Sequence, residues 1–313
     1  MPAREGPHLG PHVGVDVGGS AAKVSLLDGD GAVLRSDVHE LPDLEGDPEA
    51  NLAARLDVLA HAVRAAGPGA TVAVATPGVV DAAHRRIVAL PGKLPGLEGV
   101  DWGEALQRHG VASAPPIWVL NDGHAAVLGE VRLGAGRGAD DVAMLTLGTG
   151  VGGGVVIGGR LFEGRRRRAG QLGHLSLDPY GAPSVFPNPG SLEWCVGDAY
   201  VRDRTDGRYA GNAEVLAGVR AGEAAAREAW RRMVRALAVG IASIVHAFDC
   251  ERVVVGGGLA GAGRLLFEPL AVELDEVEWR PDGVGVPVVA AALGRHSGSI
   301  GAAVFGRERS VSP

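Results

Sequence analysis

The stretch Val13-Gly14-Val15-Asp16-Val17-Gly18-Gly19-Ser20 decides the fold of this chain. An apolar run interrupted by a single acid leads into two glycines, and a second apolar run, Ala22–Leu27, follows at once. Two strand-like runs joined by a glycine turn predict a β-hairpin. Glycines at such a bend leave consecutive backbone N–H groups unshielded, and these groups can bind phosphate oxygens. One such bend alone is most simply an ordinary hairpin turn, so the rest of the chain must decide.

The same pattern of strand and glycine turn occurs twice more. Val142–Leu147 is an apolar run that leads into Gly148-Thr149-Gly150 and further glycines, and the chain re-enters a strand at Val155–Ile157. Arg252–Val255 is typical of a strand, and it ends in Gly256-Gly257-Gly258. Neither the glycine-lysine-serine of a Walker loop nor the dinucleotide fingerprint accompanies these turns. Three glycine turns in this order favour a protein that binds phosphate groups.

Helical segments alternate with the strands. Ala53–Ala66 carries apolar residues at helical spacing and precedes the apolar segment Thr71–Ala75, while Glu223–Phe248 predicts one long helix. This alternation predicts an α/β protein whose second half echoes the first. No low-complexity linker divides the halves, so we place the boundary by motif, with an N-terminal domain of residues 1–122 and a C-terminal domain of residues 123–298.

The composition excludes several classes of protein. The chain has 313 residues, 50 of them glycine, a net charge of −7, and two cysteines, Cys195 and Cys250. Two cysteines are too few for a disulfide framework or a four-cysteine zinc site. The negative charge argues against nucleic acids and acidic membrane surfaces as main partners, because both attract basic proteins. The longest apolar stretch, Ala236–Phe248, is too short to span a membrane, and residues 1–12 lack the apolar run of a signal peptide. We therefore expect a cytoplasmic protein with a small-molecule ligand.

Acidic residues stand beside two of the strand ends. Asp16 comes two residues before the first glycine turn, where it could hold Mg²⁺ through water or simply cap the strand. Asn121-Asp122 follows the apolar strand Ile117–Leu120 and precedes a helix, a position where α/β proteins often carry catalytic groups. Phosphoryl transfer needs held phosphates, a divalent metal and a base beside the acceptor hydroxyl. Asp122 fits the base, although it would also fit an ordinary helix N-cap.

Together these motifs resemble the ROK family (repressors, open reading frames and sugar kinases) of the actin-like ATPase superfamily. The resemblance covers nearly the whole chain and rests on Asp16–Ser20, Thr76-Pro77-Gly78, Asn121-Asp122, Leu147–Gly150, Gly256–Gly258 and Ser299–Ala303. It implies an α/β fold of two actin-like, ribonuclease H-like domains hinged around a nucleotide and sugar cleft. It also implies that the C-terminal helix, about residues 299–313, packs back on the N-terminal domain.

The resemblance further implies which residues act in an ATP-dependent sugar kinase. Asp122 would take the proton of the sugar hydroxyl, and Asp16 would support Mg²⁺ through water. The nucleotide would be held by Asp16, Gly18, Gly19, Ser20, Lys23, Gly148, Thr149, Gly150, Gly256, Gly257 and Gly258. The sugar would be held by Gly78, Lys93, Asn121, Gln171, His174 and Glu193.

The sequence departs from the family pattern where a zinc loop is usual. The family's glutamate-x-glycine-histidine motif begins here with Gln171 and ends with His174, and three cysteine positions of the following loop hold Ser184, Phe186 and Ser191. Serine and phenylalanine cannot replace thiolates in a tetrahedral zinc site, so we expect no zinc. His174 is then either a direct sugar contact or a packed side chain. Glu193 either accepts sugar hydroxyls or lies in a solvated loop.

Two positively charged features leave alternatives open. Arg165-Arg166-Arg167-Arg168 is either a solvated loop or a patch that attracts a polyanion, such as polyphosphate acting as the phosphoryl donor. Lys93 stands where kinases of the family usually carry an asparagine. It either faces the sugar, where it would disfavour cationic sugars, or extends to solvent, or neutralises Glu193 or Glu98.

The leading hypothesis is a glucokinase-like enzyme that phosphorylates a hexose hydroxyl with ATP and Mg²⁺. The resemblance suggests a homodimer. The alternatives are a kinase for N-acylhexosamines or fructose and a sensor that binds sugar without turnover. About twelve residues precede the first predicted strand, so we expect no DNA-binding helix-turn-helix of the kind that the family's repressors carry.

Overall fold

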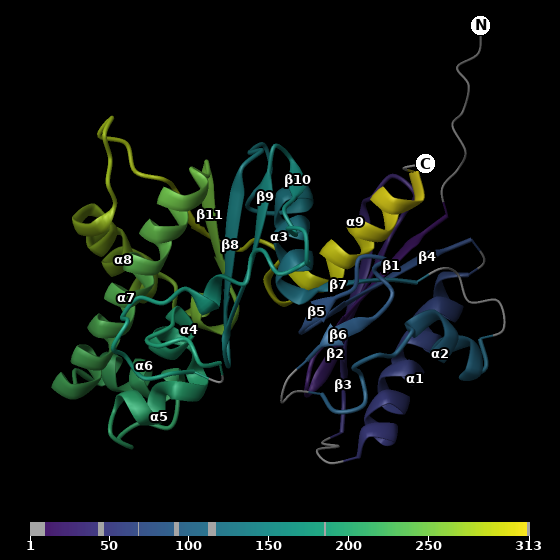
Figure 1. The fold of residues 1–313 in the computed structure, drawn as a ribbon, viewed down its shortest axis with the longest axis horizontal. Coiled ribbons are helices and arrows are strands. Elements are labelled where there is room, and N and C mark those ends of the chain that lie inside the picture. Colours follow the sequence, from purple (N-terminus) through teal and green to yellow (C-terminus); the bar gives the residue numbers. More distant parts are fainter. Residues whose placement is uncertain are drawn as a thin grey trace, which may run out of the picture. The chain divides into compact units, whose positions relative to one another are not determined.

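The computed structural model describes residues 10–42, 47–67, 69–90, 94–111, 117–184 and 186–311, and their contacts form two compact units (Figure 1). Unit 1 contains residues 1–134, 163–168 and 295–313, and unit 2 contains residues 135–162 and 169–294. Unit 1 is thus assembled from three separate stretches of the chain. In the described part of the chain, no helix combines the length and the apolar character needed to cross a membrane.

Unit 1 is built on a mixed sheet. Within the described residues its strands are β1 (His12–Val17), β2 (Ala21–Leu27), β3 (Val33–Glu40), β4 (Thr71–Thr76) and β7 (Ile117–Asn121). They lie in the order β3-β2-β1-β4-β7, with β1, β4 and β7 parallel and β2 and β3 antiparallel to their neighbours. The predicted hairpin of β1 and β2 is confirmed, with Val17 opposite Ala22 next to the glycine turn.

Helices pack on this sheet and bury its apolar side chains. They are α1 (Pro48–Ala66), α2 (Trp102–Arg108), α3 (Asp122–Leu133) and α9 (Ser297–Val311), and a short hairpin of β5 (Val79–Val80) and β6 (Ile87–Ala89) follows β4. The start of α1 is fixed by Asp47, whose carboxylate accepts a hydrogen bond from Ala50 N at 2.9 Å. The apolar face of α1 packs against β1 and β2 in the core of unit 1.

Glycines let the C-terminal helix α9 contact the backbone of its neighbours. A Cβ at Gly14 of β1 would lie 1.9 Å from the carbonyl oxygen of Ser299, and a Cβ at Gly301 of α9 would lie 1.7 Å from the carbonyl oxygen of Ala125 in α3. In Figure 1 the yellow helix α9 lies beside β1, β4 and α3. The last helix of the chain is therefore part of the core that the first strand builds.

Unit 2 repeats the arrangement with its own mixed sheet. Within the described residues its strands lie in the order β10 (Arg160–Leu161), β9 (Val151–Ile157), β8 (Val142–Leu147), β11 (Arg252–Gly256) and β12 (Val288–Ala290). Its α-helices are α4 (Leu192–Val196), α5 (Val201–Arg204), α6 (Asn212–Ala221), α7 (Ala224–Phe248) and α8 (Arg264–Val277). Short 3₁₀ helices lie at Leu172–His174, Asp198–Tyr200 and Gly258–Ala262, and another, Gly294–His296, lies where the chain returns to unit 1. The predicted α/β class, with two halves of similar build, is confirmed.

Strand β9 begins earlier than the sequence suggests. We expect the glycines after Gly150 to continue the turn until Val155, but Gly152–Gly154 already pair with β8. A Cβ at Gly152 would lie 2.5 Å from the hydroxyl of Thr146, and a Cβ at Gly153 would lie 2.9 Å from the carbonyl oxygen of Met144. These glycines therefore serve close packing inside a strand rather than a turn.

Candidate active site

The C-terminal ends of the parallel strands in unit 1 bring predicted site residues together. In the register of the sheet, Asp16 of β1 lies beside Ala75 of β4, and Thr76 at the end of β4 lies beside Asn121 at the end of β7. Neighbouring strands lie about 4.8 Å apart. Asp16 and Asn121 therefore share one edge of the sheet, where α/β proteins commonly place their catalytic groups.

Asp16 is a buried carboxylate with a lysine partner. Its side chain is 15% exposed, and its Oδ2 lies 3.3 Å from Nζ of Lys23 on β2. Burial raises the pKa of Asp16 and nearby Asp122 adds to the shift, while Lys23 opposes it. A carboxylate that has lost its water in this way would be stabilised by a divalent cation. Both the Mg²⁺ contact through water and the strand cap predicted for Asp16 are compatible with this geometry.

A cation at Asp16 would need further ligands from outside the protein. Within the described residues, no group of three or more histidine, cysteine, aspartate and glutamate side chains is placed to hold a metal ion. Mg²⁺ keeps several waters when it binds proteins and is often completed by substrate phosphates.

Asn121 fixes both the start of α3 and the loop that follows β4. Its side-chain oxygen accepts hydrogen bonds from the N–H groups of Gly123 at 2.9 Å and His124 at 3.3 Å. Its amide nitrogen donates to the carbonyl oxygen of Gly78 at 3.1 Å. Asn121 is therefore the N-cap of α3, and the alternative that Asp122 caps this helix is wrong.

Asp122 is the first residue of α3, and only one of its two carboxylate oxygens accepts a hydrogen bond within the described residues. Its Oδ1 accepts a hydrogen bond from Gly123 N at 2.8 Å, and the residue is half-buried. Within the described residues its second oxygen has no hydrogen-bond partner. A carboxylate oxygen in this position can accept a proton from a bound hydroxyl group, as general-base catalysis requires.

The first glycine turn is held from behind by Arg55 of α1, which the sequence analysis did not identify. The Arg55 guanidinium donates to the carbonyl oxygens of Gly18 at 2.9 Å and Gly19 at 3.1 Å, and the residue is 2% exposed. The C=O and N–H of one trans peptide point in opposite directions, so the N–H groups of Gly19 and Ser20 point away from Arg55. Within the described residues neither N–H donates to any acceptor. Two successive free N–H groups form a site suited to an anion.

Arg55 has a signal in the sequence that could have revealed it. Asn51 and Arg55 stand eight and four residues before Leu59, so they continue the apolar stripe of α1 with polar side chains, and both are buried. Asn51 accepts a hydrogen bond from Arg55 with its main-chain oxygen at 2.9 Å and a second one with its side chain. A buried polar pair on an apolar stripe indicates a specific partner, here the backbone of the glycine turn.

The second glycine turn, in unit 2, is built in the same way with different donors. The carbonyl oxygens of Gly148 and Thr149 accept hydrogen bonds from the backbone N–H groups of Asp198 at 3.0 Å and Ala199 at 2.9 Å. The N–H groups of Thr149 and Gly150 therefore point the other way, and they donate to no acceptor within the described residues. Each unit thus carries one turn with two successive N–H groups available to a phosphate.

Glu193 of α4 packs against this second turn. The residue is 8% exposed, and its Oε2 accepts a hydrogen bond from Val151 N at 3.0 Å. A Cβ at Gly150 would lie 2.3 Å from the same oxygen, so the turn needs a glycine to admit the carboxylate. The alternative of a solvated loop at Glu193 is therefore wrong.

The third glycine cluster lies against the strand that leads into the second turn. Gly257 has a φ of 84°, and a Cβ there would lie 2.3 Å from the carbonyl oxygen of Leu147. Leu147 is the last residue of β8 and directly precedes Gly148. Unit 2 therefore brings Gly256–Gly258 and Gly148–Gly150 to neighbouring strand ends.

The residues at the family's cysteine positions do not fit a zinc site. The ring of Phe186 packs edge-on against His174, with the ring centroids 4.4 Å apart. Ser191 is fully buried, and its hydroxyl caps α4 by accepting a hydrogen bond from Trp194 N at 3.1 Å. Ser184 accepts a hydrogen bond from Phe186 N at 3.5 Å. Aromatic packing and hydrogen bonds occupy the positions that thiolates would need, so no catalytic or structural step is assigned to zinc.

The remaining predicted site residues are Gln171, the arginine run and Lys93. Gln171 is half-buried and precedes the 3₁₀ turn of His174. In the arginine run, Arg167 pairs with Glu163 and donates to the Ala82 carbonyl oxygen at 3.2 Å, while the other three arginines are exposed. Lys93 lies outside the described residues.

Comparison with known proteins identifies the family. The sequence pattern of the ROK family matches residues 12–309. The chain belongs to the ROK family. This ROK protein is 31% identical to the glucokinase of Thermotoga maritima over 95% of its own length and 97% of that protein. It is 32% identical to an N-acetylmannosamine kinase of Escherichia coli over 93% of its own length and 96% of that protein.

The fold of the ROK protein agrees with this assignment. A ROK family glucokinase from Streptomyces griseus, solved in complex with glucose and AMPPNP, superposes with a TM-score of 0.76. The two chains are 28% identical, and the match covers 96% of this chain and all of that one. The predicted two-domain, actin-like fold of the ROK sugar kinases is therefore confirmed.

Proposed function

We propose that this ROK protein is a kinase that transfers the γ-phosphoryl group of ATP to a hydroxyl group of glucose. The observation that carries the proposal is the repeated construction of the two glycine turns. In each turn, two successive carbonyl oxygens accept hydrogen bonds, from the Arg55 guanidinium in the first turn and from backbone N–H groups in the second. Two successive N–H groups on the other side of the turn are then available to phosphate oxygens. The relative from Streptomyces griseus, which holds glucose and a nucleotide analogue, supports the choice of both ligands.

The proposed mechanism assigns a separate task to each group. Asp122 would accept the proton of the sugar hydroxyl group while the oxygen of that hydroxyl group forms a bond to the γ-phosphorus. The bond from that phosphorus to the β–γ bridging oxygen would break, and ADP would leave. Mg²⁺ held near Asp16 would offset the charge of the phosphates. Asn121 would keep Asp122 and the Gly78 loop in register, because it contacts both α3 and that loop.

The first test is an assay of sugar phosphorylation with ATP and Mg²⁺. Asp122→Asn should lower kcat for glucose by about 10²–10⁴-fold, the usual effect of losing a general base, and leave nucleotide binding unchanged. Asp57→Asn is a matched control, because Asp57 is a surface carboxylate that, within the described residues, pairs only with His109. If Asp122→Asn keeps more than a tenth of the wild-type rate, Asp122 is not the base.

The same assay should include N-acetylmannosamine, because one relative is named a kinase of that sugar. The E. coli protein of 32% identity is named an N-acetylmannosamine kinase, so this sugar is the strongest alternative to glucose. Fructose completes the panel. The sugar with the highest kcat/KM identifies the substrate. Saturable sugar binding with no phosphorylation of any of them would instead make the protein a sensor.

A further inference from the structure

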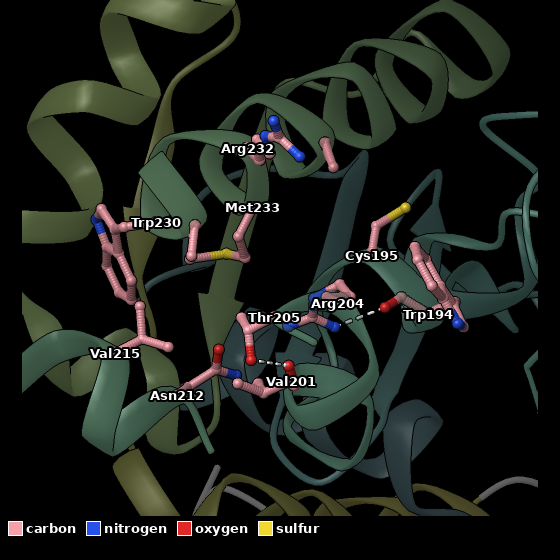
Figure 2. Close-up of a pocket in the computed structure, with 12 residues that line it drawn as sticks. Trp194, Cys195, Val201, Arg204, Thr205, Asn212, Val215, Trp230, Arg232 and Met233 are labelled. Atoms are coloured by element: carbon pink, nitrogen blue, oxygen red, sulfur yellow. Dashed lines mark hydrogen bonds between the residues drawn. The ribbon is translucent and has the colours of Figure 1, made fainter. Parts of the chain in front are cut away.

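Unit 2 contains a cavity of about 170 Å³ for which the proposed reaction has no use (Figure 2). Residues of helices α4, α5, α6 and α7 line most of it, and one side is open to solvent. Neither Gly148–Gly150 nor Gly256–Gly258 contributes to its lining. The cavity is therefore separate from the glycine clusters to which we assign the nucleotide.

The walls of this cavity are mostly apolar and aromatic. Trp230 and Met233 of α7 and Val215 of α6 are 6%, 4% and 3% exposed, and Trp194 and Cys195 of α4 line the opposite side in Figure 2. A cavity of about 150 Å³ with apolar walls is large enough to hold a benzene ring. The space therefore suits a ligand with one ring.

Arg204 of α5 gives the cavity a positive charge, while Arg232 of α7, which also lines it, pairs with Glu228. Its Nη1 donates to the carbonyl oxygens of Trp194 at 2.5 Å and Gly197 at 2.9 Å, and the first of these bonds is drawn in Figure 2. Within the described residues no carboxylate oxygen lies within 4.0 Å of this guanidinium. Burial lowers the pKa of Arg204 to about 10, so the group stays charged at neutral pH. A second nitrogen of the fork and Nε keep donors for a ligand.

We propose that this cavity binds an organic anion with a single aromatic ring, whose carboxylate pairs with Arg204 and whose ring lies among Trp230, Met233 and Val215. Burying an unpaired cation is costly, and a carboxylate is the group that a guanidinium binds best.

The cavity is also coupled to the second glycine turn through one short segment. Arg204 binds the carbonyl oxygen of Gly197, and the next two residues, Asp198 and Ala199, hold the carbonyl oxygens of Gly148 and Thr149. A Cβ at Gly197 would lie only 3.1 Å from the carbonyl oxygen of Thr149. A ligand that moves Arg204 would therefore shift the donors that orient the turn. We expect nucleotide affinity to change about 5-fold or more when the cavity is filled, within the usual range of coupling between two sites.

Binding can be measured with benzoate and its neutral analogue benzyl alcohol. Two of the five tryptophans line the cavity, so tryptophan fluorescence reports binding, and calorimetry checks it. Benzoate should bind at least about tenfold more tightly than benzyl alcohol, because a hydrogen bond to a charged group raises the affinity by about tenfold or more. Equal affinity for the two probes, or no saturable binding of benzoate, would overturn the proposal.

Two pairs of variants locate the binding. Arg204→Met should remove the preference for benzoate, whereas Arg202→Met, which changes an exposed arginine outside the cavity, should keep it. Ala229→Leu fills the cavity without removing charge and should abolish binding of both probes, while Ala225→Leu on the same helix should not. If Arg204→Met does not fold, the alanine pair decides. Unchanged benzoate binding in Ala229→Leu places the ligand elsewhere and overturns the proposal.

The coupling is tested separately by titrating AMPPNP with and without saturating benzoate. This part rests on the proposed function, because it requires that the protein binds a nucleotide. An affinity for AMPPNP that is the same in both titrations would overturn the effector role. Absence of nucleotide binding in both would instead refute the proposed function, and the benzoate titrations would still decide the cavity.

Discussion

Replacing Arg55 by methionine should disable the first glycine turn while leaving the fold in place. The guanidinium makes two hydrogen bonds to the carbonyl oxygens of Gly18 and Gly19. Hydrogen bonds to charged groups contribute about 1.5–3 kcal/mol each to stability, and the variant loses both. Part of this loss is offset because the variant no longer buries a cation. We expect the free energy of unfolding to fall by about 2–4 kcal/mol. Without its tether the turn can rotate, and a misplacement near 1 Å costs about 10²-fold in rate.

The assay compares kcat/KM for ATP at a temperature well below the unfolding midpoint. Arg64→Met is the matched control, because Arg64 is an exposed residue in the last turn of the same helix. Arg55→Lys should be intermediate, since an ammonium group keeps the charge but lacks the fork that reaches both carbonyl groups. If Arg55→Met and Arg64→Met differ by less than twofold in kcat/KM for ATP, Arg55 does not position the turn.

Three further predictions concern metal, pH and substrate. Purified protein should carry no stoichiometric zinc, since Phe186 packs on His174; one zinc per chain retained through dialysis against a mild chelator would contradict this. Because burial raises the pKa of Asp16, its contribution to stability falls as the pH rises above the ordinary value of 3.8. In chelator, Asp16→Asn should therefore gain stability relative to wild type with rising pH, and a constant difference in chemical denaturation would refute the shift. Glucosamine should be a poorer substrate than glucose by about tenfold or more, and Lys93→Asn should narrow the gap; equal ratios of kcat/KM in both proteins would mean that Lys93 does not face the sugar.

The sequence predicts well those features that depend on neighbours in the chain. A β-hairpin, a strand followed by glycines, and an acid at a strand end are local patterns, and β1, β2 and β8 occur where the patterns place them. The proximity of Asp16 and Asn121 also follows from the sequence, because parallel strands end at a common edge.

Other features depend on contacts between distant residues and leave little trace in the sequence. Arg55 acts on the backbone of Gly18 and Gly19, which lie 37 and 36 positions away, and a carbonyl group has no sequence signature. Residues 163–168 belong to unit 1 although the chain on both sides of them belongs to unit 2. The early start of β9 at Val151 was missed because Gly152–Gly154 look like a turn until the close approach of Thr146 is known.

The position of α9 in unit 1 has a consequence for how the protein is made. Strand β1 leaves the ribosome well before α9, the helix that covers it and contacts it at Gly14. About 160 residues separate the end of α3 from that final stretch, so synthesis at about 5–20 residues per second delays the completion of unit 1 by roughly 8–30 s. During that interval β1 and β4 expose an apolar surface that α9 will later bury. The nascent chain should therefore be a client of ribosome-associated chaperones until α9 has emerged.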